Sequence, residues 1–139
     1  MIADQKRFAA TLAAFDVANA EDPNLDESQP KELLYAQRMS AMLARFAPNA
    51  SEVARLAVRA QHIQRWQTPR ASYPMDRQGY LQWRTGLYKF HAETAGRIMR
   101  EAGYDEATIE RVQAAVGKKA LKVNPDTQLL EDITDLVFL

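Results

Sequence analysis

Cysteine is absent from the 139 residues of this sequence, which excludes disulfides, thiolate metal sites and cysteine nucleophiles together. A chain without cysteine suits a reducing compartment, so we expect a cytoplasmic protein. Long apolar runs are also missing, because no stretch of about eighteen apolar residues occurs. Residues 1–15 lack the apolar centre of a secretory signal. The sequence therefore predicts no membrane-spanning segment and no membrane partner.

Net charge is missing as well, because 18 basic residues balance 18 acidic ones. Such a chain has no overall field that would draw it to nucleic acid, so any nucleic-acid partner would need a local basic patch. The sequence also contains no glycine-rich phosphate loop, no HExxH motif and no GxSxG nucleophile elbow. Its length fits one domain, which we place at residues 1–139.

Apolar periodicity predicts an all-α fold, a single compact domain of about six helices, and no strand pattern is convincing. The expected helices begin near Asp4, Lys31, Ser51, Tyr80, Asp105 and Asn124. The third runs into Trp66, and the fourth ends where Gly103 supplies a left-handed cap. The acidic, turn-rich segment 19–30 is expected to be a loop.

The sequence ends on the apolar run Leu-Val-Phe-Leu at residues 136–139, still in helical register. A chain terminus is more often polar and frayed. We therefore expect either that this end packs into the core or that the full-length protein continues beyond it.

A cationic and aromatic cluster occupies the stretch from His62 to His91. It contains both histidines, both tryptophans and three of the five tyrosines of the chain, against a single acid, Asp76. Its basic residues are Arg65, Arg70, Arg77, Arg84 and Lys89, and its aromatic residues are Trp66, Tyr73, Tyr80, Trp83, Tyr88 and Phe90. This enrichment makes the stretch the candidate functional site.

The cluster predicts a site for a small anion, because guanidinium groups pair with phosphate or carboxylate and aromatic faces stack on bases. The expected ligand-binding residues are Arg65, Trp66, Arg70, Tyr73, Arg77, Tyr80, Trp83, Arg84, Lys89, Lys118 and Lys119. The alternative is that the aromatic side chains are core, the arginines reach water, and the two lysines belong to a solvated helix end.

His62 and His91 lie on two neighbouring predicted helices and are the candidate catalytic residues. They could act as general acid and base, or they could bind a divalent metal, with Asp132 as a further candidate ligand. The alternatives are structural histidines and a solvated Asp132 near a helix start. The metal therefore stays an open possibility.

Several stretches carry a family resemblance. They are residues 16–24 (DVANAEDPN), 30–39 (PKELLYAQRM), 61–66 (QHIQRW), 69–84 (PRASYPMDRQGYLQWR), 89–93 (KFHAE) and 129–139 (LLEDITDLVFL). Together they resemble an uncharacterised bacterial and fungal family, domain-of-unknown-function family four-two-zero-two. The resemblance implies that members continue with further helix beyond the last residue here.

The helix order is also similar to the HD superfamily of metal-dependent phosphohydrolases, and this resemblance implies an HD-like fold. In that superfamily a histidine, an adjacent His-Asp pair and a distal aspartate bind metal. The first position falls here on Tyr35, the pair on Gln61-His62 or His62-Ile63, and the distal carboxylate on Asp132 or Asp135. The resemblance therefore implies a degenerate site centred on His62.

Three functional hypotheses follow. The leading one is a pocket for a phosphorylated or nucleotide-like small molecule, with or without hydrolysis of that ligand, and it requires the arginines to converge on one cavity. The second is a non-catalytic helical module that binds RNA or a protein on an open patch. The third is a scaffold whose arginines form ion pairs with acids such as Asp76 and Glu93.

Overall fold

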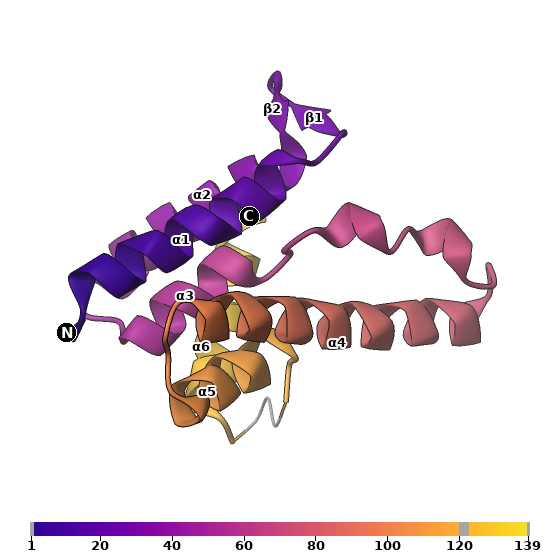
Figure 1. Ribbon diagram of the computed structural model, residues 1–139. Helices are drawn as coiled ribbons and strands as arrows, with labels where there is room; N and C mark the ends of the chain where they lie inside the picture. The colour runs from indigo at the N-terminus through magenta and orange to yellow at the C-terminus, as the bar shows by residue number, and fades with distance from the viewer. Residues whose placement is uncertain (1, 120–122, 139) are drawn as a thin grey trace.

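The structure, a computed structural model, describes residues 2–119 and 123–138 of the chain. It is an all-α domain (Figure 1), which confirms the expected fold class. The elements are α1 (Gln5–Ala20), β1 (Leu25–Asp26), β2 (Gln29–Pro30), α2 (Lys31–Phe46), α3 (Glu52–Ala60), η1 (Arg65–Gln67), η2 (Arg70–Ser72), α4 (Arg77–Glu101), α5 (Glu106–Val116) and α6 (Pro125–Val137), where η denotes a 3₁₀ turn.

Most helix ends follow from local capping chemistry. The side chains of Asp4, Ser51 and Asn124 each accept a hydrogen bond from a backbone N–H in the first turn of α1, α3 and α6. Pro125 occupies the first turn of α6, where the missing N–H costs no helical hydrogen bond. Gly103 follows α4 with φ +99, a value that favours glycine. The predicted positions of these ends are confirmed.

The third helix was predicted to run into Trp66, and this is wrong. α3 ends at Ala60, and Gln64 has a left-handed backbone with φ 51. The Gln64 N–H donates to the side-chain oxygen of Asn19 at the end of α1, over 3.0 Å. A hydrogen bond between distant segments therefore replaces the helical one.

The segment 19–30 was predicted to be a loop without strands, and this is only partly right. α1 continues to Ala20, and β1 and β2 then pair antiparallel with Leu25 opposite Pro30. Glu27 and Ser28 take positive φ values at the turn between them. The hairpin is too short to change the fold class.

α3 forms the centre of the domain, because it contacts α1, α2, α5 and α6. The largest fully buried side chains of the core are Phe15, Met39, Leu43, Leu56, Ile63, Met99, Ile109, Leu130 and Ile133. The N-terminal half of α4 projects beyond this core, and residues 61–76 run out along it (Figure 1). We call residues 61–76 the arm. In the described part of the chain, none of the helices has the length and apolarity needed to cross a membrane.

Candidate functional site

A cavity of about 340 Å³ lies where the N-terminal half of α4 meets the arm, α6 and the turn after α5. Its lining residues are Gln61, His62, Arg65, Tyr80, Trp83, Arg84, Leu87, Tyr88, His91, Lys118, Glu131, Thr134 and Phe138. We call it the histidine cavity. It brings together both candidate catalytic histidines and a subset of the predicted ligand-binding residues.

Two arginines reach the histidine cavity from different elements. The guanidinium of Arg65, in η1, lies 5.3 Å from the centroid of the Trp83 ring. The guanidinium of Arg84, in α4, donates to the hydroxyls of Tyr80 and Tyr88. Both arginines are therefore held by neutral aromatic groups and keep their charge available to a ligand.

Lys118 adds a third cationic group from the turn after α5, and it forms an ion pair with Glu131 of α6. Burial, together with the nearby charge of Arg84, lowers the pKa of Lys118 to about 8, and Asp135 opposes this shift. The ionised Glu131 carboxylate also favours the charged amine. Lys118 is therefore mostly protonated at neutral pH, and the cations lining the cavity outnumber its one carboxylate.

His91 is 2% exposed and forms part of the cavity wall. Its Nδ1 lies 2.9 Å from the backbone oxygen of Ile63. A carbonyl can only accept a hydrogen bond, so Nδ1 carries the proton and Nε2 carries a lone pair. Burial, together with the neighbouring His62, lowers the pKa of His91 to about 3. His91 is therefore neutral at physiological pH.

His62 is more accessible, with a side chain that is 24% exposed. Its ring stacks on Tyr35 and lies 6.1 Å from the ring of His91, measured between centroids. Its Nδ1 lies 3.4 Å from a carboxylate oxygen of Glu32, whose side chain is 6% exposed. Burial lowers the pKa of His62, and the Glu32 carboxylate opposes this effect. The cavity thus has two neighbouring imidazoles in different electrostatic settings.

Two residues at positions that the HD resemblance gives to metal ligands, Tyr35 and Gln61, are hydrogen-bonded to each other. The Tyr35 hydroxyl donates to the side-chain oxygen of Gln61 over 2.5 Å, and the Gln61 amide donates to the Thr134 hydroxyl over 2.9 Å. Burial raises the pKa of Tyr35, which keeps its hydroxyl protonated. A protonated phenol and an amide are poor ligands for a divalent metal, so these residues do not fit the HD metal.

The candidate metal set of His62, His91 and Asp132 is also not assembled. Asp132 accepts a hydrogen bond from Gln128 of its own helix over 2.9 Å, and it is not among the cavity lining. Among residues 2–119 and 123–138, no three side chains of the His, Cys, Asp or Glu type lie together as a metal site. Glu131 and Thr134 are the residues of α6 that line the cavity, and Asp132 is not one of them.

Several predicted ligand-binding residues lie elsewhere. Arg70 donates to the backbone oxygens of Tyr73, Pro74 and Asp76, so its guanidinium holds the arm together. The hydroxyl of Tyr73 lies against Gly86 of α4. Arg77 is exposed at the start of α4. These three residues are therefore not part of the histidine cavity.

Trp66 also lies outside the histidine cavity. It borders a neighbouring hollow of about 230 Å³, together with Arg65, Trp83 and the Glu32 side chain. Arg65 and Trp83 contribute to both spaces, and the Trp83 indole donates to the Thr68 oxygen over 2.8 Å. Trp83 is thus a wall between the two spaces.

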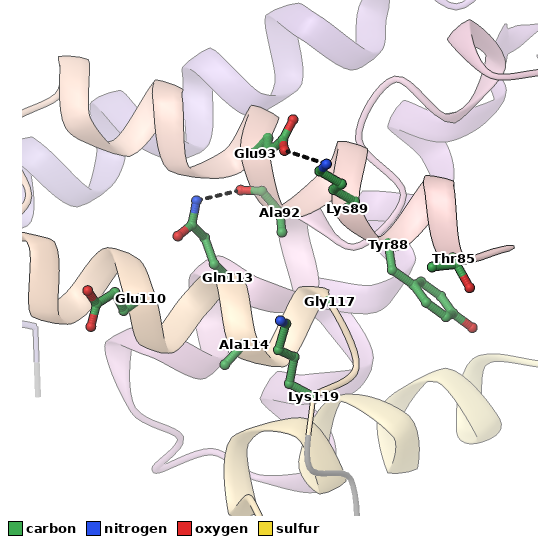
Figure 2. A pocket seen from close by; sticks show the side chains of 10 residues that line it. All are labelled: Thr85, Tyr88, Lys89, Ala92, Glu93, Glu110, Gln113, Ala114, Gly117 and Lys119. Atoms are coloured by element: carbon green, nitrogen blue, oxygen red, sulfur yellow. Dashed lines mark hydrogen bonds and ion pairs between the residues drawn. The ribbon is translucent and has the colours of Figure 1, made fainter. Parts of the chain in front are cut away.

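Lys89 and Lys119 line a second cavity, of about 540 Å³, between α4 and α5 (Figure 2). Its lining residues are Thr85, Tyr88, Lys89, Ala92, Glu93, Glu110, Gln113, Ala114, Gly117 and Lys119. Lys89 lies 3.9 Å from the Glu93 carboxylate, as the dashed line in Figure 2 marks. The basic run after α5 therefore divides, with Lys118 in the histidine cavity and Lys119 in this one.

Three polar residues at the site were missed by the sequence reading: Glu32, Glu131 and Thr134. Each comes from a segment far from the central cluster and was not recognised as part of a site. One signal for Glu32 was present, because Glu32 and Tyr35 are three residues apart on one face of α2. An acid on the face that also carries the first HD position indicates a buried polar role.

The chain belongs to the family described as Domain of unknown function (DUF4202), whose model matches residues 9–139. This confirms the family resemblance drawn from the sequence motifs. No curated protein matches the chain, and no solved structure does. The family description names no activity.

Proposed function

We propose that the histidine cavity binds a small phosphorylated molecule, such as a phosphate monoester or a nucleotide. One observation carries the proposal: Arg65, Arg84 and Lys118 come from three separate parts of the chain and line the same cavity. Convergent cationic donors in a partly buried space recognise phosphate oxygens strongly. Each positive charge is worth more there than on an open surface, because solvent screens it less.

The size and walls of the cavity agree with such a ligand. Its volume of about 340 Å³ is in the range of small-molecule sites. Tyr80, Trp83, Tyr88 and Phe138 provide aromatic surface beside the cationic groups. A base or another flat apolar group could pack on these rings while the phosphate pairs with the cations.

The partners of the arginines favour binding over a scaffold role. Within the described chain, neither Arg65 nor Arg84 has a carboxylate within ion-pair distance, whereas Arg59 pairs with Asp16 over 2.7 Å. An arginine retained for ion pairing alone would be expected to have such a partner. The predicted ion pairs with Asp76 and Glu93 therefore do not account for Arg65 and Arg84.

The depth of the cavity favours a small ligand over RNA or a protein partner. His91 is 2% exposed, and a macromolecule on the surface would not reach it. An HD-like arrangement belongs to the same proposal, because Gln61 and His62 line this cavity and Tyr35 contacts both of them. We also propose a cytoplasmic location, which the absence of cysteine suits. Phosphorylated metabolites would be available to the cavity there.

Calorimetric titration with inorganic phosphate and with adenosine monophosphate tests the proposal, and adenosine is the uncharged control. We expect saturable binding of both phosphates and weaker binding of adenosine. Arg65→Gln and Arg84→Gln should each weaken phosphate binding by about tenfold or more, because each removes one charge-assisted contact. Arg77→Gln is the matched control, since Arg77 is exposed at the start of the same helix.

Absence of binding by both phosphates would contradict the proposal. So would an equal loss of affinity in Arg77→Gln and Arg84→Gln, because that result would indicate general surface charge instead of a defined site. The titrations are made at one ionic strength, so that screening is the same for all variants.

A further inference from the structure

We propose that His62 is the general base for hydrolysis of the bound phosphate ester, without a metal, and that Glu32 is the residue that positions it. This inference rests on the proposed function, because the ester must first occupy the histidine cavity. It adds a reaction to the binding site and a role for a carboxylate that lies outside the cavity lining.

The first support is the orientation of the His62 ring. Its Nδ1 lies 3.4 Å from the Glu32 carboxylate, and a carboxylate only accepts hydrogen bonds. This contact favours the tautomer with the proton on Nδ1, which leaves the lone pair on Nε2. Glu32 borders the neighbouring hollow, whereas His62 lines the histidine cavity. Nε2 is therefore the ring nitrogen available on the cavity side.

The second support is the fixed position of Glu32. Its backbone N–H donates to Asp22 over 2.9 Å, and the other oxygen of Asp22 accepts from the backbone and side chain of Asn24. Asp22 and Glu32 are each 5% exposed. One turn further along α2, the Tyr35 ring covers a face of His62. α2 thus holds the imidazole at one edge and on one face, which is the preorganisation that a general base needs.

His91 is the competing candidate for the base, and its surroundings suit that role less. Its Nδ1–H faces the neutral carbonyl of Ile63, while that of His62 faces a carboxylate. A carboxylate stabilises the imidazolium that forms when the base accepts a proton, and a carbonyl does so less. His91 is also deeper in the core, at 2% exposure. We therefore assign proton acceptance to His62.

The step is an ordinary hydrolysis whose only co-reactant is water. The water oxygen attacks phosphorus while its proton passes to Nε2 of His62. The bond between phosphorus and the ester oxygen breaks, the electron pair goes to the leaving oxygen, and solvent protonates that oxygen. The imidazolium then releases its proton to solvent, which yields inorganic phosphate and an alcohol. Arg65 and Arg84 would pair with the non-bridging oxygens as charge develops on them.

The test uses the full chain with 4-nitrophenyl phosphate in the presence of EDTA, and it measures release of nitrophenolate. This leaving group is a stable anion, so its departure needs no general acid. We expect release above the buffer rate. His62→Asn should abolish it, Glu32→Gln should lower kcat by about tenfold or more with KM within about twofold, and Arg77→Gln should leave both unchanged.

A second readout separates positioning from folding. Nitrogen NMR of the His62 ring should show Nδ1 protonated in the wild type and a mixture of tautomers in Glu32→Gln. If Glu32→Gln unfolds, Glu32→Asp is used in its place, because it keeps a carboxylate on a shorter side chain. We expect Glu32→Asp to retain part of the wild-type rate. An unchanged kcat or an unchanged tautomer in folded Glu32→Gln would overturn the role of Glu32.

The outcome also separates this inference from the proposed function. Binding of inorganic phosphate without nitrophenolate release would overturn the hydrolysis and leave the binding proposal standing. Release that persists in His62→Asn would overturn the assignment of the base. If the wild type neither binds inorganic phosphate nor releases nitrophenolate, the binding proposal and the hydrolysis proposal are both overturned.

Discussion

The rings of Tyr35 and His62 are stacked, with centroids 4.3 Å apart and 16° between their planes. This contact joins α2 to the segment that follows α3 at the wall of the histidine cavity. The Tyr35 hydroxyl donates a hydrogen bond to Gln61, and the Gln61 amide donates one to Thr134 of α6. Tyr35 therefore has two roles: its ring stacks on His62 at the site, and its hydroxyl forms a hydrogen bond that joins the helices. The two roles can be tested separately.

Tyr35→Phe should keep the stacking on His62 and remove the hydrogen bond to Gln61. We expect the free energy of unfolding in urea to fall by about 1–2 kcal/mol, because the Gln61 oxygen loses its donor in a part-buried place. Phosphate affinity should change little. Tyr35→Ala should lower both quantities, and an equal loss of affinity in the two variants would contradict the separation.

Asp16→Asn should destabilise the packing of α1 on α3. Arg59 donates two hydrogen bonds to Asp16, over 2.8 and 2.7 Å, and the side chains are 16% and 29% exposed. Because the pair is bidentate but partly exposed, we expect a loss of about 1–2 kcal/mol in urea unfolding. Glu27→Gln is the control at the more exposed pair with Arg38, where the loss should stay below about 0.5 kcal/mol. Equal losses would show that burial does not distinguish the pairs.

Gly79→Ala should displace the arm from α4. An alanine Cβ would lie 1.9 Å from the backbone oxygen of Pro74, so the backbone has to move. We expect thermal unfolding at a lower temperature, with a loss of about 1–3 kcal/mol, and weaker phosphate binding because Arg65 belongs to the arm. At Gly86 the nearest atom is the Tyr73 hydroxyl at 2.9 Å, which can rotate away. Gly86→Ala should therefore leave affinity unchanged, and a matching loss there would contradict this account.

His91 should make the protein less stable in acid. Its pKa is about 3 in the folded chain, against about 6.5 when unfolded. Below pH 6.5 the unfolded state binds a proton that the folded state does not, so the free energy of unfolding falls as the pH falls towards 3. The contribution is up to about 1.4 kcal/mol per pH unit, and it is constant above neutral pH.

His91→Asn provides the comparison, because an asparagine amide can still donate to the Ile63 oxygen. Urea unfolding between pH 7 and pH 4.5 should show a shallower dependence in this variant than in the wild type. His62 acts in the same direction and is present in both proteins. Identical slopes would exclude His91 as a source of the acid sensitivity.

The sequence was sufficient for features that depend on neighbouring residues. Capping side chains and Gly103 give the helix ends, because their hydrogen bonds and backbone angles are local. The end of α3 was not predictable in this way, since the Gln64 N–H bonds to Asn19, 45 residues earlier in the chain. Tertiary contacts, and not propensity, decide that boundary.

The site residues also divide into those that local sequence predicts and those that only tertiary contacts bring together. His62, Arg65, Arg84 and His91 were found because the arm and α4 are adjacent in sequence and carry them to one cavity. Arg70 was wrongly placed there, because composition does not reveal that backbone oxygens of its own arm occupy its guanidinium. Glu32, Glu131 and Thr134 join the site only through helix packing, which no local pattern records.

The chain of hydrogen bonds from Tyr35 through Gln61 to Thr134 crosses three helical segments in the interior. Apolar side chains tolerate small sliding of one helix along another, because dispersion and burial have little directional preference. Hydrogen bonds in a part-buried setting do not, since a shift of a few ångströms leaves each donor and acceptor unsatisfied. These three side chains therefore fix the axial register of α2 and α6 against the end of α3, where His62 follows Gln61.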